Sequence, residues 1–508
     1  MTDPTIQWEA VKGMAAARSR GHGHVTRVLE EIGVPRSSAY RWELKLRWFL
    51  DFGSAELRRL QHERDQLRAE LWRLLEREAR VAPMGPDQER AVILLLAVSG
   101  TSDEQIAAVL ERLDGRRRSH ETIRAAINEA ARVARVAFGR WFAGTGEVAA
   151  VDEIFLGESP LLLAVEPVSL LISGLRLAEG RTAEHWQPVF AELGELARCL
   201  ADGARGIAKA SAEAGVPLQS DMYHLLRGAR ALVEASWRSC EGLLAAELKA
   251  QRHYEAIRYT HSKKDTSSAG QRYYRARAAC TRALEDCCRL DDLFRQVEGA
   301  FDYTTPDGKL NTSARAKRRV AEAIEALQRP AGNRGDKPTA RAQRLAGEFA
   351  KILRAPAFAF LDVLEAGLSV LRREQVGPTR EAVLAGLVAE TVAWRRLHKA
   401  PVKELEAASD GSLRDQVEMT VLKVVDRAQR SSSYVECVNA RIRTVQVARK
   451  RLSEDFVYLV AVYHNLKPFG RGSVREGRSP AELAGIELPT TDWIQLLDLT
   501  ARELANAA

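Results

Sequence analysis

Three short apolar runs that follow one another between residues 148 and 178 constrain the fold more than any other feature. They read VAAVDEIFL, PLLLAVEPV and SLLISGLRLA, and the breaks between them contain glycine, glutamate, serine and proline. Apolar runs of this length, bounded by turn residues, predict three strands in a meander. Residues 183–221 then alternate between helical and strand-like sequence, with short strands expected in RCLAD and VPLQSD. Antiparallel strands followed by helical crossovers predict an α/β core with a mixed sheet.

The chain has 508 residues, which is too long for one ordinary domain. The expected fold class is multidomain and mostly α, with an α/β core that a helix-rich, charged insertion interrupts. The expected order is a helix-turn-helix unit at 1–50, a short coiled coil at 51–82, a second helix-turn-helix-like unit at 83–143, the first part of the core at 144–227, an all-α insertion at 228–430, and the second part of the core with the C-terminal tail at 431–508.

The segment GHGHVTRVLEEIGVPRSSAYRWELKLR is typical of a helix-turn-helix. A first helix is expected to end near Ile32, and Pro35 suits the first turn of the second helix, where its missing N–H costs nothing. In such a unit the second helix places side chains near base edges and phosphates. The residues expected to bind DNA here are Arg36, Ser37, Ser38, Arg41 and Lys45. An ordinary helical hairpin is the alternative.

The next segment has leucines in a heptad pattern. Leu60, Leu67 and Leu74 are seven residues apart, and Leu57 and Leu71 fill the alternate seam positions. This pattern predicts a short coiled coil, whose commonest use is self-pairing, so a homo-oligomer is expected. Packing against a neighbouring domain is the alternative.

Residues 83–143 repeat the helix-turn-helix theme. Thr101 with Glu104 is expected to form a capping box at the start of one helix. The basic turn GRRRS then leads into a second helix, and basic residues at such a turn favour phosphate contact. The residues expected to bind DNA in this unit are Arg117, Arg118, His120 and Arg124.

Charge and composition narrow the classes of protein that fit. The net charge is +8 in a chain that is 28% charged, which is compatible with binding to polyanions. The six cysteines lack CxxC and Cys/His zinc spacing, so we expect reduced, buried thiols. No signal peptide opens the sequence, and no apolar stretch reaches the ~20 residues that span a bilayer. A cytoplasmic protein with no membrane partner is expected.

Three acidic residues are the strongest indication of chemistry. Asp152 and Asp202 lie at or beside the ends of strand-like runs, and Glu436 opens the basic, helix-like segment ECVNARIRTVQVARKRLS. Carboxylates that converge on two Mg²⁺ ions are what cleavage of nucleic-acid phosphodiesters needs. Taken singly, each is more often a cap, turn or surface residue. Strand alternation directs Glu153 to the opposite face, and Glu166 is expected to be structural or, less often, a metal ligand.

With these residues the chain resembles the DDE-type transposases of bacterial insertion sequences, in the branch whose ribonuclease H-like core is split by a helical insertion before the glutamate. The resemblance covers about residues 148–490. It implies that Asp152, Asp202 and Glu436 are catalytic and bind two Mg²⁺ or Mn²⁺ ions. The closing sequence GRSPAELAGI resembles the tail that follows the glutamate helix in many of these enzymes.

The resemblance also implies accessory residues. Asp221 and His224, in QSDMYHLLR, match an accessory Asp-x-x-His; a helix cap and a packed histidine are the alternatives. Asn439 accompanies Glu436 on its helix. The basic residues expected to hold DNA phosphates on that segment are Arg443, Arg449 and Arg451, with a solvated helix face as the alternative. The chain departs from some relatives in having Gln429 and Ser432 where they have tyrosine and arginine.

The function implied is a DNA transposase that cuts double-stranded element ends and joins them to target DNA, as a homo-oligomer associated with the nucleoid. Two alternatives stay open. One is a catalytically silent, domesticated transposase that acts as a DNA-binding regulator through residues 1–140. The other is a ribonuclease H-like nuclease that cuts without joining, which the tandem helix-turn-helix units fit poorly.

Overall fold

The structure is a computed structural model that describes residues 84–258, 263–329, 339–373, 378–397, 402–409, 411–449 and 452–507. The first helix-turn-helix and the coiled coil lie outside these ranges, as do the expected DNA-binding residues Arg36, Ser37, Ser38, Arg41, Lys45 and Arg451. The described chain forms two compact units. One contains residues 224–358 and 378–385, and the other contains 84–223, 359–373 and 386–507, each with the gaps given above.

The second unit contains a five-stranded mixed sheet in the order β3-β2-β1-β4-β5. Strands β1, β2 and β3 form an antiparallel meander, whereas β4 runs parallel to β1 and β5 runs parallel to β4. The predicted meander and the two later parallel strands are therefore confirmed. The strands are β1 (Val148–Leu156), β2 (Ser159–Val165), β3 (Ile172–Leu177), β4 (Arg198–Ala201) and β5 (Leu218–Ser220).

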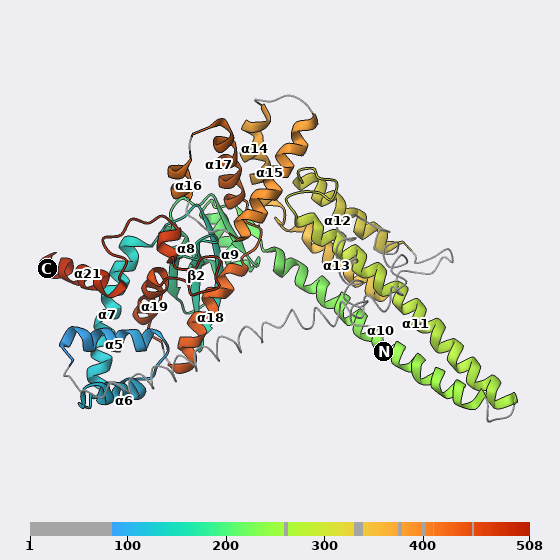
Figure 1. Cartoon of the computed structure of the whole chain (residues 1–508), viewed down its shortest axis with the longest axis horizontal. Helices are drawn as coiled ribbons and strands as arrows, with labels where there is room; N and C mark the ends of the chain where they lie inside the picture. The colour runs from blue at the N-terminus through green and yellow to red at the C-terminus, as the bar shows by residue number, and fades with distance from the viewer. Residues whose placement is uncertain are drawn as a thin grey trace. The chain divides into compact units, whose positions relative to one another are not determined.

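One face of the sheet is covered by the two crossover helices, α8 (Ala183–Leu193) and α9 (Arg205–Glu213) (Figure 1). Trp186 is fully buried there, in the same cluster as Ala149 and Val151 of β1. Because side chains alternate along a strand, the even-numbered residues of β1 face the other side. Ala150 and Ile154 accordingly belong to a second core on the opposite face.

That opposite face is covered by helices from both ends of the described sequence (Figure 1). The second core runs without a break from the helices of residues 86–141 to the sheet and to the C-terminal helices. Phe138 and Tyr458 illustrate it, with ring centroids 5.2 Å apart. The helices that contribute to this core are α5 (Pro86–Val98), α6 (Asp103–Asp114), α7 (His120–Trp141), α18 (Ser433–Ala448), α19 (Glu454–Leu466), α20 (Pro480–Leu483) and α21 (Trp493–Ala507), of which α18 and α19 pack on the sheet.

Helices α6 and α7 lie where the second helix-turn-helix-like unit is predicted, and the start of α6 differs locally from the prediction. The capping box at the start of α6 is made by Ser102 and Gln105, so the expected pair Thr101 and Glu104 is wrong by one residue. Ser102 has the extended backbone of an N-cap, and its hydroxyl accepts a hydrogen bond from Gln105 N at 3.3 Å. Gly115 ends α6 with φ of 73°, a conformation that glycine adopts without strain.

The predicted insertion is mostly helical in its described residues, with a non-helical stretch at 302–312 that contains an isolated β-bridge. The boundary between the two compact units falls inside it, after residue 358, although residues 378–385 again belong to the first unit. The helices before this boundary are α10 (Met222–Arg258), α11 (Lys263–Glu298), η1 (Gly299–Phe301), α12 (Ser313–Gln328) and α13 (Ala340–Arg354). Those after it are α14 (Ala359–Arg373), α15 (Pro378–Leu397), α16 (Val402–Ala408) and α17 (Leu413–Arg427).

The cysteines and the membrane prediction can be compared with the structure directly. None of the six cysteines forms a disulfide, and five of them are buried as expected. Cys437 on α18 is exposed, so the expectation of a buried thiol is wrong there. None of the helices in the described ranges is long and apolar enough to cross a bilayer.

Candidate catalytic centre

Asp152 lies inside β1, and the strand continues to Leu156. The expectation that Asp152 lies at or beside the end of its strand is therefore wrong for the strand as a whole, because the hairpin with β2 carries β1 further and pairs Asp152 with Leu163. What ends near Asp152 is the parallel pairing with β4, whose last partner on β1 is Ala150. Asp152 thus stands just beyond the point where β1 and β4 part.

Asp152 is held by two hydrogen bonds, one to each carboxylate oxygen. Its Oδ1 accepts from the backbone N–H of Glu153 at 2.9 Å. Its Oδ2 accepts from Asn439 Nδ2 of α18, also at 2.9 Å. Asn439 is fully buried, and it lies three residues after Glu436, on the same side of the helix. The sheet therefore presents Asp152 to the helix that carries Glu436.

The pKa of the Asp152 carboxyl is raised to about 6, chiefly by burial. The nearby carboxylates of Glu436 and Glu153 contribute to this rise, and the two hydrogen bonds oppose it. No basic side chain among the described residues forms an ion pair with Asp152. Glu436 itself is exposed and lies 3.9 Å from the guanidinium of Arg443.

Asp202 comes directly after β4 and is exposed. Its Oδ1 accepts a hydrogen bond from Ala204 N at 2.8 Å, in a turn where Gly203 has a φ of 85°. The charge of Asp202 acts on another carboxylate, that of Glu153, whose side chain lies on the face of the sheet opposite to Asp152. Burial raises the pKa of Glu153, an ion pair with Arg181 at 3.1 Å lowers it, and the charge of Asp202 raises it again.

Glu153 was expected on the face opposite to Asp152, and its contacts confirm this. Its side chain is 8% exposed and pairs with Arg181, which precedes α8. The second oxygen, Oε2, is buried and has no hydrogen-bond partner within the described residues. Arg181 was not singled out from the sequence, because nothing in its local pattern indicates a partner 28 residues earlier.

A divalent cation fits the donor types of this centre, although the described side chains are not gathered into a metal cage. No group of three or more histidine, cysteine, aspartate or glutamate side chains in the described ranges is placed to hold a metal ion. The oxygens that surround Asp152 are nevertheless of the kind that Mg²⁺ prefers. The Oδ1 of Asn439 is buried without a partner among the described residues, and the Asp152 carboxylate forms no ion pair with them. The three-carboxylate metal site stays a prediction.

Asp221 joins the end of strand β5 to the start of helix α10 and is fully buried. Its Oδ2 accepts hydrogen bonds from Ser432 N and, at 3.1 Å, from Ser431 Oγ. The neighbouring Met222 N donates to Arg430 O at 3.2 Å. These contacts attach the end of the sheet to the start of α18, which carries Glu436. His224 is half-buried in the first turn of α10.

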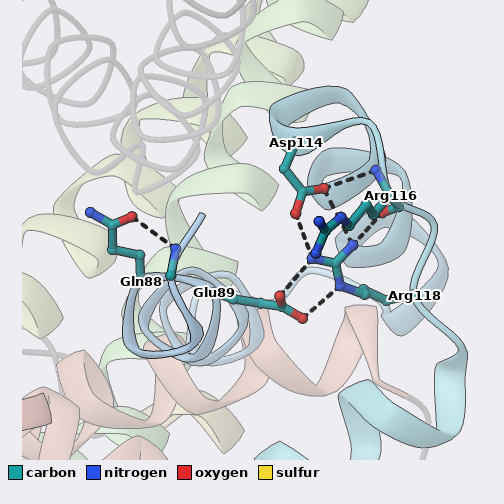
Figure 2. A network of polar contacts seen from close by, with 6 residues as sticks. Gln88, Glu89, Asp114, Arg116 and Arg118 are labelled. Carbon is teal, nitrogen blue, oxygen red and sulfur yellow. Dashed lines mark hydrogen bonds and ion pairs between the residues drawn. The ribbon is translucent and has the colours of Figure 1, made fainter. Parts of the chain in front are cut away.

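Among the residues expected to bind DNA, Arg118 is instead engaged inside the protein. Figure 2 shows its guanidinium between Glu89 of α5 and Asp114 of α6. Two of its nitrogens donate to the Glu89 carboxylate at 2.7 and 2.6 Å, and a third donates to Arg116 O at 2.7 Å. Asp114 is buried. Arg118 therefore fixes the turn between α6 and α7.

The other residues expected to bind DNA differ in whether they already form ion pairs within the protein. Arg117 and His120 are exposed at the turn and the first residue of α7, and the described residues provide neither with an ion pair. Arg124 and Arg449 both pair with Asp103, at 2.8 and 2.9 Å. Arg443 is 57% exposed beside Glu436. Arg117, His120 and Arg443 are the best placed of these residues to meet a phosphate.

No family model matches the chain, and no curated protein matches it. The function therefore has to be inferred from the chain's own residues and their geometry.

Proposed function

We propose that the chain is a DNA transposase of the DDE type, which cuts a phosphodiester at the ends of a mobile element and joins the freed 3′-hydroxyl to target DNA. One observation carries the proposal. The carboxylate of Asp152, half-buried in the central strand β1, is hydrogen-bonded to α18 and faces the charge of Glu436 from that helix. These residues are separated by more than 280 positions in the sequence.

The architecture supports this assignment. A meander of three strands followed by two parallel strands, in the order β3-β2-β1-β4-β5, has the arrangement of a ribonuclease H-like core. Asp152 lies on the central strand, and Asp202 directly follows the strand beside it. The helical residues between β5 and α18 then correspond to an insertion that splits such a core.

Asp152, Asp202 and Glu436 would hold two Mg²⁺ or Mn²⁺ ions. When bound, such ions activate the attacking oxygen and neutralise the charge that develops on the leaving oxygen. The protein's part is positioning. Asn439 Nδ2 and the N–H of Glu153 hold the two oxygens of Asp152 in place, and both bonds favour the ionised carboxylate. Asp221 fixes the start of α18 and so the position of Glu436.

Double-stranded DNA suits the charged surface of the chain. The net charge is +8, and Arg117, His120 and Arg443 are exposed beside the second helix-turn-helix and the centre. Electrostatic attraction to phosphates supplies most of the sequence-independent affinity for DNA. The helix-turn-helix units would read the element ends, and self-pairing through the leucine heptads would bring two ends together. An enzyme with this substrate would work in the cytoplasm at the nucleoid.

A DNA-binding regulator without catalysis is the second candidate. The observation that favours it is that no three metal-binding side chains come together within the described residues. A regulator would keep Asp152, Asp202 and Glu436 only as structural carboxylates.

Product analysis separates the candidates. The full chain would be incubated with Mg²⁺, a supercoiled target plasmid and a duplex from the DNA that flanks its gene and carries the inverted repeats. The proposal predicts cut ends covalently joined to the plasmid. Cut ends without joining would identify a nuclease, and stable binding without any cutting in Mg²⁺ or Mn²⁺ would identify a regulator.

A further inference from the structure

Two largely buried arginines, one of them on α18, lie against the same aromatic ring. Arg441 belongs to α18, and Arg475 belongs to the segment between α19 and α20. Each guanidinium carbon is 5.8 Å from the centre of the Phe469 ring. Burial lowers the pKa of both guanidinium groups. Two positive charges therefore lie close together and partly out of solvent, and a negatively charged partner is expected beside them.

The polar partner of Arg441 is a neutral histidine. His464 is buried, and burial lowers its pKa to about 3, so the ring is uncharged at neutral pH. Its Nε2 lies 2.8 Å from the carbonyl oxygen of Leu170 and therefore carries the hydrogen. Its Nδ1 is then free to accept from Arg441 Nη1 at 3.0 Å. The charge of Arg441 is not balanced by this contact.

Arg475 is also bound to a neutral group. Its Nε donates to Val168 O at 3.0 Å, and its Nη2 is buried with no hydrogen-bond partner among the described residues. The carboxylate that acts on Arg475 is Glu166. That carboxylate already accepts hydrogen bonds from Val168 N, Ser169 N and Ser169 Oγ, at 3.0, 2.6 and 2.6 Å. Neither Arg441 nor Arg475 forms an ion pair within the described residues.

The cluster continues to the surface of α18. Tyr434, Cys437 and Arg441 follow one another at helical spacing, so they share one side of the helix. Cys437 is exposed. In contrast to Arg441 and Arg475, Arg395 is neutralised by Asp426 at 2.6 Å.

We propose that the two arginines over the Phe469 ring, Arg441 and Arg475, bind a backbone phosphate of the DNA strand that passes the catalytic centre. The inference rests on the proposed function, because a DNA strand is expected beside α18 only if Glu436 of that helix belongs to the catalytic centre. A guanidinium fork matches the geometry of phosphate oxygens and is weakly hydrated, so it binds phosphate well where it is partly buried.

The test measures the salt dependence of DNA binding, which needs no cleavage. A fluorescent duplex of arbitrary sequence would be titrated with the full chain in EDTA, at a series of KCl concentrations. Each phosphate contact contributes about 0.9 to the slope of log K against log salt. Arg475→Gln and Arg441→Gln are each expected to lower the slope by about 0.9, whereas Arg475→Lys, which keeps the charge, is expected to retain it.

Arg478→Gln is the matched control. Arg478 lies in the same segment as Arg475 but is already paired with Glu404, so its replacement is expected to leave the slope unchanged. An unchanged slope in Arg475→Gln protein with the parent's circular dichroism spectrum would overturn the inference, and so would an equal loss in Arg478→Gln. Because cutting is not measured, a chain that binds with these slopes but never cleaves would refute the proposed catalysis and leave the phosphate site standing.

Discussion

Asn439 of α18 donates a hydrogen bond of 2.9 Å to Asp152 of β1, across 287 positions of sequence. This bond links the central strand to the helix that carries Glu436. It also favours the ionised form of Asp152, which burial and the neighbouring carboxylates oppose. The balance between these effects leads to the first two predictions.

Replacing Asn439 by alanine removes the donor and leaves the other influences on Asp152 in place. The pKa of Asp152 should then rise above about 6, so the acidic limb of the pH–rate profile for DNA cleavage should move to higher pH. Loss of the buried bond should also cost about 1–3 kcal/mol of stability. Gln446→Ala is the control, because Gln446 bonds to Phe155 O on the same strand at 3.1 Å and not to Asp152. A limb that stays in place would show that Asn439 does not tune Asp152.

The raised pKa of Asp152 also predicts how stability varies with pH. A carboxyl whose folded pKa exceeds its unfolded value favours folding below the unfolded pKa, and this contribution is lost as pH rises through about 6. Asp152→Asn should therefore stabilise the metal-free protein at pH 8, by roughly 1–3 kcal/mol, and should have little effect near pH 3.5. Urea denaturation at the two pH values measures this. Equal effects at the two pH values would mean that burial and the neighbouring carboxylates do not raise the pKa of Asp152.

Arg118 and Arg117 are neighbours with different predicted roles. Arg118→Ala breaks the contacts with Glu89 and the buried Asp114, and should lower the free energy of unfolding. Arg117→Ala should leave stability unchanged and lower the salt slope of DNA binding by about 0.9. Thermal denaturation and DNA titrations on both variants distinguish the roles. A stable Arg118→Ala protein with a reduced slope would make Arg118 a DNA contact after all.

Asp221 is predicted to position α18 and not to bind metal. Asp221→Ala removes the acceptor for Ser432 N and Ser431 Oγ, which should cost about 1–3 kcal/mol and slow cleavage. The affinity for Mn²⁺, measured by calorimetry, should change little, because the carboxylate is directed at the start of α18. A large loss of Mn²⁺ affinity in folded Asp221→Ala protein would instead assign it to the metal site.

Much of the sheet could be predicted from the sequence, because the pattern that marks a strand is local. The alternation along β1 also placed Glu153 on the face opposite to Asp152, and its ion pair with Arg181 lies there. The position of Asp152 inside β1 could not be predicted, since the length of the hairpin depends on its pairing with β2.

Local sequence patterns could not predict contacts between residues that are far apart in the sequence. The basic turn before α7 predicted DNA contact for Arg118, but its sign of charge does not reveal that Glu89, 29 residues earlier, already binds it. Arg475 lies in a polar loop-like segment, and nothing nearby in sequence indicates that it packs with Arg441 on Phe469. The capping box moved by one residue because the sequence offers two adjacent pairs of suitable type.

The central claim is that Asp152 holds a catalytic metal ion for DNA cleavage. The most direct test compares the parent and Asp152→Asn proteins on the same end-bearing duplex in Mg²⁺, with binding measured beside cutting. Asparagine keeps the volume of the side chain but is a weaker ligand for a hard cation. The account predicts unchanged binding and a loss of cleavage and joining by several orders of magnitude, with the same result for Asp202→Asn and Glu436→Gln. Cleavage that survives in Asp152→Asn would contradict it.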